Sequence, residues 1–127
     1  MFDYTVETTS GMEGTIEKLK TNLMEEKFGV LWEFDIQAKL QEKGLEFNDP
    51  YKVLEVCNPH EAKRVLDKNK MVGYFLPCKI VVYTDQGKTK IGMPKPTALI
   101  QYVNNAELNE IAADIEKRLI SAIDQSI

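Results

Sequence analysis

The stretch YKVLEVCNPHEAKRVL, residues 51–66, contains the clearest structural signals of the sequence. Its first half predicts a β-strand, in which Glu55 and Cys57 point to the same side because successive side chains alternate. Asn58 suits the N-cap of a helix, and Pro59 suits the first helical turn, where its missing N–H is not needed. The stretch therefore predicts a strand that passes directly into a helix, with a cysteine at the corner.

Two interpretations of Cys57 stay open. A helix start has unpaired N–H groups and the positive end of a dipole, which lower the pKa of a nearby thiol and increase the fraction of reactive thiolate. Alternatively, Cys57 is a small buried residue that finishes a strand, as free cysteines commonly are. Glu55 on the same face is then either a carboxylate that tunes the thiol or a solvated strand residue.

A second cysteine, Cys78, follows Pro77 at the start of another predicted strand, residues 79–84. The helix that begins at Pro59 carries the chain away by about 18 Å at 1.5 Å per residue. The connection that follows spans at most about 23 Å when extended, so the chain can return fully. This favours an antiparallel neighbour with Cys78 close to Cys57. A parallel strand after a right-handed crossover is the competing geometry.

The chain begins with a predicted strand and a predicted helix. Residues 2–8 alternate between apolar and polar side chains, as in a strand with one buried face. Ser10–Glu13 has the spacing of a capping box, in which two side chains satisfy backbone N–H groups at a helix start. Apolar residues at spacings of three and four then predict an amphipathic helix that Gly29 closes.

A second strand and a short helix precede the central stretch. Residues 30–36 alternate again, which places Trp32 and Phe34 on one face, where we expect them to belong to the core rather than to a base-stacking surface. The segment QAKLQEKG then predicts a short helix that ends at Gly44. An Asn-Asp-Pro turn separates this helix from the next strand.

The C-terminal part predicts a hairpin and a long helix. Residues 79–84 and 88–93 are strands joined by the turn DQGK, in which Gly87 is free to adopt positive φ. Asn104–Glu107 has the spacing of a second capping box. Apolar residues at helical spacing follow it and indicate the buried face of an amphipathic helix: Leu108, Ile111, Ala112, Ile115, Leu119 and Ala122.

The order of elements predicts an α+β fold over one domain, residues 1–127. Strand, helix, strand, short helix, strand, helix, hairpin and helix follow one another without repeats or an internal linker. Such an order is typical of one mostly antiparallel sheet with helices packed on one face. The length and the 43% apolar composition are those of an ordinary globular domain with a substantial core.

Charge and hydropathy argue against several function classes. The net charge is −4 and basic residues are interleaved with acidic ones, so we do not expect binding to nucleic acid, which needs a concentrated positive surface. No signal peptide and no apolar run long enough to span a membrane are recognisable. The two cysteines form no disulfide framework, which suggests a cytoplasmic protein with reduced thiols.

Other catalytic motifs are absent from the sequence. No phosphate-binding glycine loop and no nucleophile elbow occur. Cys57 and His60 with Cys78 offer three zinc ligands, but this spacing is a weak signal and we expect no metal site. The sequence does not identify a cofactor, and a bound cofactor stays open.

Three segments of the chain carry a resemblance. FGVLWEFDIQAKLQEKG, YKVLEVCNPHEAKRVL and VGYFLPCKIVVYTDQGKTKIGMPKPTALI resemble the Domain of Unknown Function 302 family over most of the chain. The shared signature is Glu-x-Cys-Asn-Pro at the end of one strand and Leu-Pro-Cys at the start of the next. All of its positions are present here: Glu55, Cys57, Asn58, Pro59, Leu76, Pro77 and Cys78.

The resemblance implies a compact α+β fold similar to one copy of the TATA-box-binding-protein-like fold, often as a homodimer. It implies no nucleic-acid function, because a fold alone does not carry one. The family has no settled activity, so whether the protein is an enzyme stays open. What the resemblance supports is the cysteine corner as the shared feature.

Two functional hypotheses follow, with one plain alternative. The first is a protein that binds a small molecule or cofactor beside the cysteine corner, with a predicted site formed by Glu55, Cys57, Asn58, Pro77 and Cys78. The second is a thiol-based redox or sulfur-handling protein, in which Cys57 is the activated thiol and Cys78 its resolving partner. In the third, both cysteines are buried structural residues and the function lies on another surface.

Overall fold

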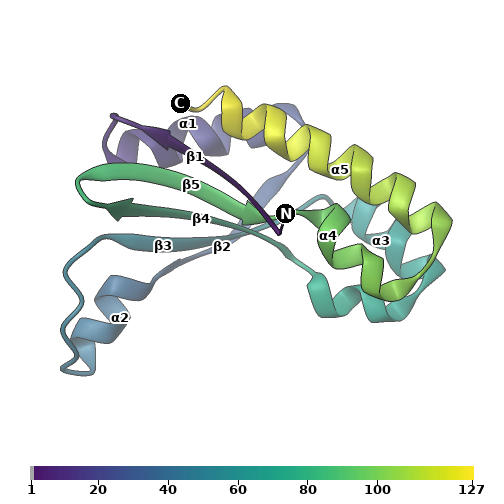
Figure 1. Cartoon of the computed structure of the whole chain (residues 1–127), viewed down its shortest axis with the longest axis horizontal. Helices are drawn as coiled ribbons and strands as arrows, with labels where there is room; N and C mark the ends of the chain where they lie inside the picture. The colour runs from purple at the N-terminus through teal and green to yellow at the C-terminus, as the bar shows by residue number, and fades with distance from the viewer. Residues whose placement is uncertain (1) are drawn as a thin grey trace.

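The computed structural model describes residues 2–127, which contain one five-stranded antiparallel sheet with helices on one face (Figure 1). The strands lie in the order β1, β5, β4, β3, β2. Their bounds are β1 Asp3–Thr8, β2 Gly29–Asp35, β3 Tyr51–Cys57, β4 Cys78–Asp85 and β5 Lys88–Pro94. The helices are α1 Met12–Glu25, α2 Ile36–Glu42, α3 Pro59–Lys68, α4 Pro96–Ile100 and α5 Ala106–Asp124, with the 3-10 segments η1 Lys70–Phe75 and η2 Gln101–Val103. The predicted α+β class is confirmed.

The central pair of strands has the predicted antiparallel arrangement. After α3 and η1 the chain returns along β3 as β4, with Val56 opposite Cys78 and Leu54 opposite Ile80. β4 then turns at Gln86 and Gly87, which both adopt positive φ, into β5. Two such residues in a two-residue turn match the twist of an antiparallel hairpin.

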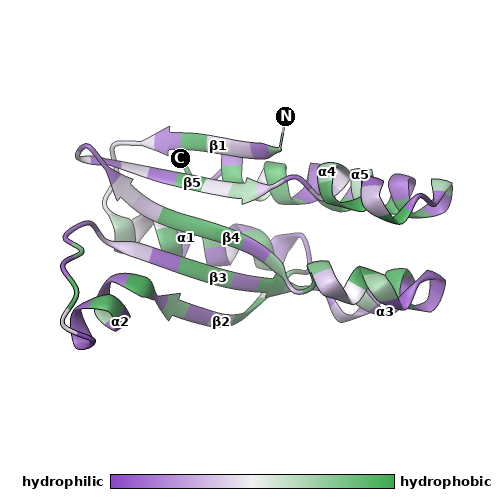
Figure 2. Cartoon of the chain, turned by 60° about the horizontal axis from the view of Figure 1, so that its bottom comes forward, coloured by the Kyte–Doolittle hydropathy of each residue, from purple (hydrophilic) through white to green (hydrophobic). Residues whose placement is uncertain are grey.

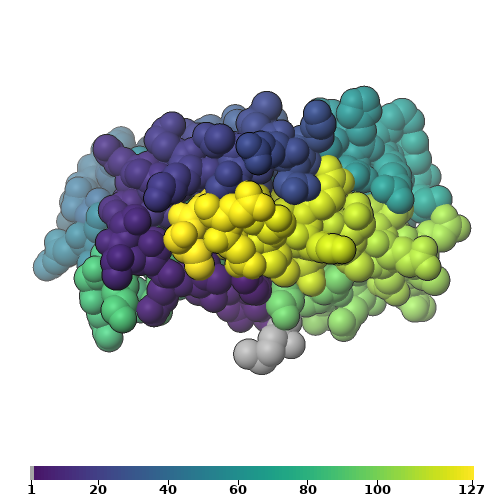
Figure 3. All heavy atoms as spheres, turned by 90° about the horizontal axis from the view of Figure 1, so that it is seen from above, coloured from purple at the N-terminus to yellow at the C-terminus, as the bar shows by residue number. Residues whose placement is uncertain are grey.

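The core lies between one sheet face and the helices α1 and α5. Alternate residues of the central strands are fully buried there, among them Leu54, Val56, Ile80 and Val82. The predicted apolar stripe of the C-terminal helix is buried as well: Leu108, Ile111, Ala112, Ile115, Leu119 and Ala122. Viewed from the helical side of the sheet, α1 and α5 lie next to each other and cover the strands (Figure 3). Burial of this apolar surface is the main stabilising contribution to the fold.

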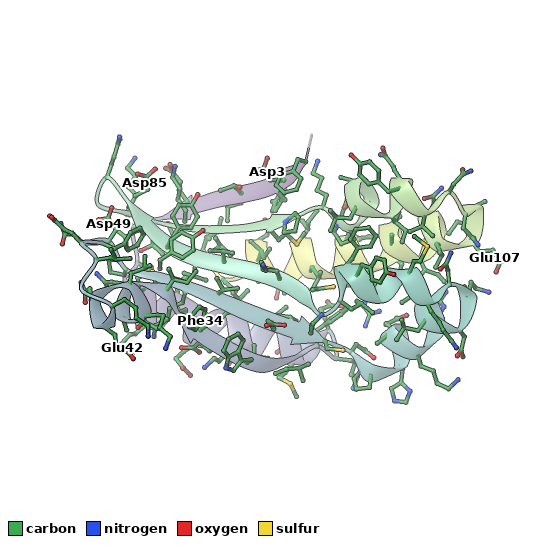
Figure 4. The ribbon with its side chains drawn as sticks, turned by 90° about the horizontal axis from the view of Figure 1, so that it is seen from below. Asp3, Phe34, Glu42, Asp49, Asp85 and Glu107 are labelled. Atoms are coloured by element: carbon green, nitrogen blue, oxygen red, sulfur yellow. The ribbon has the colours of Figure 1, made fainter. Side chains whose placement is uncertain are left out.

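The opposite sheet face has no helix packed over its centre (Figure 4). Phe34 and Asp3 mark its two edges, on β2 and β1. The expectation that Trp32 belongs to the core is wrong: 53% of its surface is exposed, and its ring stacks on Phe34 with centroids 5.0 Å apart. The cause is a β-bulge between Val30 and Trp32, which shifts the alternation so that Val30 faces the core and Trp32 the uncovered face.

Three helix ends differ from the prediction. The N-cap of α1 is Gly11, with no side-chain cap, so Ser10 and Glu13 form no capping box. The helix α1 ends at Glu25, before the predicted end at Gly29. Lys27 adopts positive φ in the connection that follows, and Gly29 begins β2. The N-cap of α5 is Asn105, whose side chain accepts from Leu108 N, so the predicted capping box that starts one residue earlier is also wrong.

Candidate functional site

A groove with a volume of about 770 Å³ opens where the central strands leave the covered part of the sheet. At this end of the molecule α3, α4 and α5 extend beyond the sheet (Figure 2). The strands β3, β4 and β5 contribute the rest of the lining, together with the N-terminal strand. A volume in this range is typical of small-molecule sites.

The helical side of the groove is apolar. α5 contributes the part of its stripe that extends beyond the sheet, and α3, η1 and α4 face it with aliphatic side chains. The lining residues on these elements include Val65, Val72, Leu99, Ile100, Leu108 and Ala112. Most of them are buried, whereas Leu99 on α4 is only half-buried and lies at the surface of the groove.

The strand side of the groove is more polar. Glu55 and Lys79 face each other across the β3–β4 ladder and both line the groove. Asp3 lines it from β1 and accepts a hydrogen bond from the Thr5 hydroxyl at 2.6 Å. Tyr83 lines it further along the strand. The groove thus joins an apolar half between helices to a half with charged groups on the uncovered sheet face.

Three of the five residues predicted from the sequence lie at this groove. Glu55, Pro77 and Cys78 line it, and Pro77 follows a cis peptide bond. Cys57 and Asn58 do not line it. Asn58 is buried, and its side-chain oxygen accepts from the backbone N–H groups of the first turn of α3, at 2.9 and 3.2 Å. Its role is that of the predicted helix cap.

Of the two interpretations of Cys57, the one with a lowered pKa has no support in the structure. Burial raises the pKa of Cys57, and burial together with the nearby charge of Cys57 raises the pKa of Cys78 to about 11. The helix start does not compensate, because the side chain of Asn58 already binds its N–H groups. Both thiols are free and stay protonated at neutral pH.

The two cysteines occupy adjacent strands but different faces of the sheet. Cys78 lies opposite Val56, whose side chain points into the core, and Cys78 packs against the core as well. Cys57 is the next residue after Val56 and therefore points to the other face, as Glu55 does. The alternation therefore places the two thiols on different faces, and both are free.

Within residues 2–127, no three histidine, cysteine or acidic side chains are grouped as metal ligands. His60 is exposed on the first turn of α3. None of the described helices is both long enough and apolar enough to cross a membrane.

Comparison with known families settles the relationship of this chain. A family model described as a domain of unknown function, DUF302, matches residues 4–126. The chain belongs to the DUF302 family. A crystal structure of an uncharacterized conserved DUF302 protein from Bacillus stearothermophilus is 59% identical in sequence, with a TM-score of 0.97 over 100% of this chain and 99% of that chain. No curated protein matches.

Most of the groove was not recognisable in the sequence. Pro96 begins α4, a helix that is missing from the predicted elements, and α4 carries Leu99 into the groove. A proline at a first helical position is the signal for that helix. The remaining lining residues gave no local signal, since they repeat the ordinary apolar pattern of core helices.

Proposed function

We propose that this protein binds a small molecule with a substantial apolar part in the groove between α3, η1, α4 and α5. The observation that carries the proposal is the groove itself: a volume of about 770 Å³ lined mainly by apolar side chains from eight helical and strand segments. Apolar surface left accessible at a concave site favours a ligand that removes it from water.

The positions of the signature residues Pro77 and Cys78 support the same site. Pro77 and Cys78 lie where η1 joins β4, at the boundary between the apolar and the polar half of the groove. Cys78 contributes a protonated thiol there, which behaves as a small apolar group. We therefore assign Glu55, Pro77 and Cys78 to ligand binding, Cys57 to the strand end beside the site and Asn58 to the cap of α3.

A redox function has less support. The raised pKa values of Cys57 and Cys78 reduce the thiolate fraction at neutral pH, and thiolate is the form that attacks disulfides. The placement of the two thiols on different faces of the sheet adds a geometric obstacle. We infer that these cysteines are not a resolving pair. We expect both thiols to stay free when the protein is treated with a mild oxidant.

The family resemblance implies a homodimer, and the cysteine pattern suggests a cytoplasmic location; we propose both. Sedimentation equilibrium tests the first: a homodimer has twice the 14.5 kDa mass of one chain. Fractionation of cells that express the protein tests the second.

Calorimetric titration with 1-octanol tests ligand binding. Leu99→Trp places a large side chain at the surface of the groove, and we expect it to weaken octanol binding at least about tenfold, because it occupies volume that the ligand needs. Leu45→Trp is the matched control, since Leu45 is 57% exposed and does not line the groove. Equal affinity of wild type and Leu99→Trp, or no octanol binding to wild type, contradicts the proposal.

A further inference from the structure

We propose that the ligand of this groove is a cationic amphiphile, with its apolar part between α3 and α5 and an amine or quaternary ammonium group at Glu55. The inference rests on the proposed function and adds the chemical class of the ligand. Its basis is the arrangement of charged and aromatic side chains at the strand end of the groove.

The charges that line the groove favour a cation. Among residues 2–127, two acidic residues, Asp3 and Glu55, and one basic residue, Lys79, line the groove. Asp3 accepts a hydrogen bond from Thr5, and none of the ion pairs within residues 2–127 includes it. A positively charged ligand group restores the balance of charge at this end of the groove, whereas a carboxylate ligand adds to the excess of negative charge.

Glu55 is the most suitable partner for such a group. Its side chain is half-buried, and none of the ion pairs within residues 2–127 includes it. Lys79 lies opposite in the ladder but is exposed and more than ion-pair distance from the Glu55 carboxylate. Burial weakens the hydration of a carboxylate, so a half-buried carboxylate without a nearby cation is stabilised when a cationic ligand group binds beside it.

One aromatic side chain outside the groove lining lies beside Glu55 on the uncovered face, and two that line the groove lie further along the strands. Trp32 lies directly opposite Glu55 on β2, with 53% of its surface exposed. Further along the face, the rings of Tyr51 and Tyr83 lie 5.3 Å apart, and both residues line the groove. Aromatic faces attract ammonium groups, and quaternary ammonium ligands are commonly bound by a carboxylate with aromatic neighbours.

The apolar half of the groove determines the rest of the ligand. Pro77 and Cys78 lie between the strand end that carries Glu55 and the aliphatic walls formed by α3 and α5. A ligand whose cationic group reaches Glu55 therefore places its remaining atoms against Val65, Leu108 and Ala112. This continuity favours an unbranched or narrow apolar chain over a compact polar cation.

The test compares three probes that share one tail: octyltrimethylammonium, 1-octanol and octanoate, each titrated calorimetrically below its micellar concentration. We expect octyltrimethylammonium to bind wild type at least about fivefold more tightly than octanol, and octanoate to bind more weakly than octanol. In Glu55→Gln the preference for the cation falls below about twofold, while octanol affinity is unchanged. In Glu55→Lys the order of the two charged probes reverses.

Glu7→Gln is the matched control, because it removes the same charge from the same sheet face outside the groove. It keeps the cation preference of wild type. A preference that survives in Glu55→Gln, or octanoate binding as tightly as octyltrimethylammonium, overturns the cationic class. The proposed function still stands in that case if octanol binds and Leu99→Trp prevents it. Absence of binding by all three probes overturns both.

Discussion

Cys78 shows at the scale of one residue how burial governs chemistry in this protein. The sequence favours a strand arrangement that brings Cys78 close to Cys57, and such a pair suggests reactive thiols. The structure places its sulfur against the apolar core, where the thiolate is poorly solvated, and this raises its pKa to about 11. The same atom is therefore better suited to contact an apolar ligand than to attack a disulfide.

The raised pKa of Cys78 predicts a loss of stability in alkaline solution. The unfolded thiol ionises near pH 9, whereas the folded one holds its proton until about pH 11, so the unfolded state gains between these values. We expect this group alone to lower the free energy of unfolding by up to about 2 kcal/mol from pH 9 to pH 11. Urea unfolding of wild type and Cys78→Ala across this range measures it. Identical pH slopes in the two proteins contradict the prediction.

Asn58 is a residue whose role the sequence predicts correctly. It caps α3 with two hydrogen bonds from the first turn. We expect Asn58→Ala to lower the free energy of unfolding by about 1–2 kcal/mol. Asn58→Asp keeps most of the wild-type stability, because a carboxylate also accepts these hydrogen bonds. Denaturant unfolding gives both values. A loss from Asn58→Asp as large as that from Asn58→Ala rules out the capping explanation.

At the scale of elements, one arginine connects three helical segments. Arg118 on α5 donates to Glu61 of α3 at 2.6 Å and to the carbonyl oxygen of Glu26, the C-cap of α1, also at 2.6 Å. Its guanidinium also lies over the ring of Phe28, 4.9 Å from the centroid. These contacts hold α3 at its place beside α5, and that place determines one wall of the groove.

Replacing Arg118 therefore affects both stability and binding. Arg118→Leu removes hydrogen bonds to a charged and a backbone group in a partly buried place, and we expect a loss of about 2–3 kcal/mol in the free energy of unfolding. Arg64→Leu is the control, because Arg64 is exposed and also pairs with Glu61, at 3.0 Å. We expect this variant to lose less than about 1 kcal/mol of the free energy of unfolding. Equal losses in both variants contradict the role given to Arg118.

The elements also show what the sequence can and cannot predict. β3, α3 and α5 are predicted with nearly correct bounds, because their patterns are local: a strand parity, a cap with proline, and a long apolar stripe. α4 and η1 are missed because they are short and depend on packing. The bulge in β2 is missed because a shift of one residue moves Trp32 to the other face without any change in composition.

At the scale of the whole molecule, the groove exists because the helical segments α3, η1, α4 and α5 extend beyond the sheet and line it together with the strands (Figure 2). Only Glu55, Pro77 and Cys78 of this site are predicted from the sequence, since they belong to a local signature at adjacent strand ends. The apolar wall is formed by residues from α3, α4 and α5 that lie far apart in the chain. Their meeting is a property of tertiary packing and leaves no trace in a local pattern.

The central claim is that the groove binds the apolar part of a small ligand, and the most direct test is to locate bound 1-octanol by NMR. Methyl groups of the labelled protein are followed during titration. The account predicts saturable shifts at groove residues such as Val65, Leu99 and Leu108, with none at the exposed Leu31 and Leu45 outside it. Shifts confined to Leu31 and Leu45, or no saturable shifts at all, contradict it.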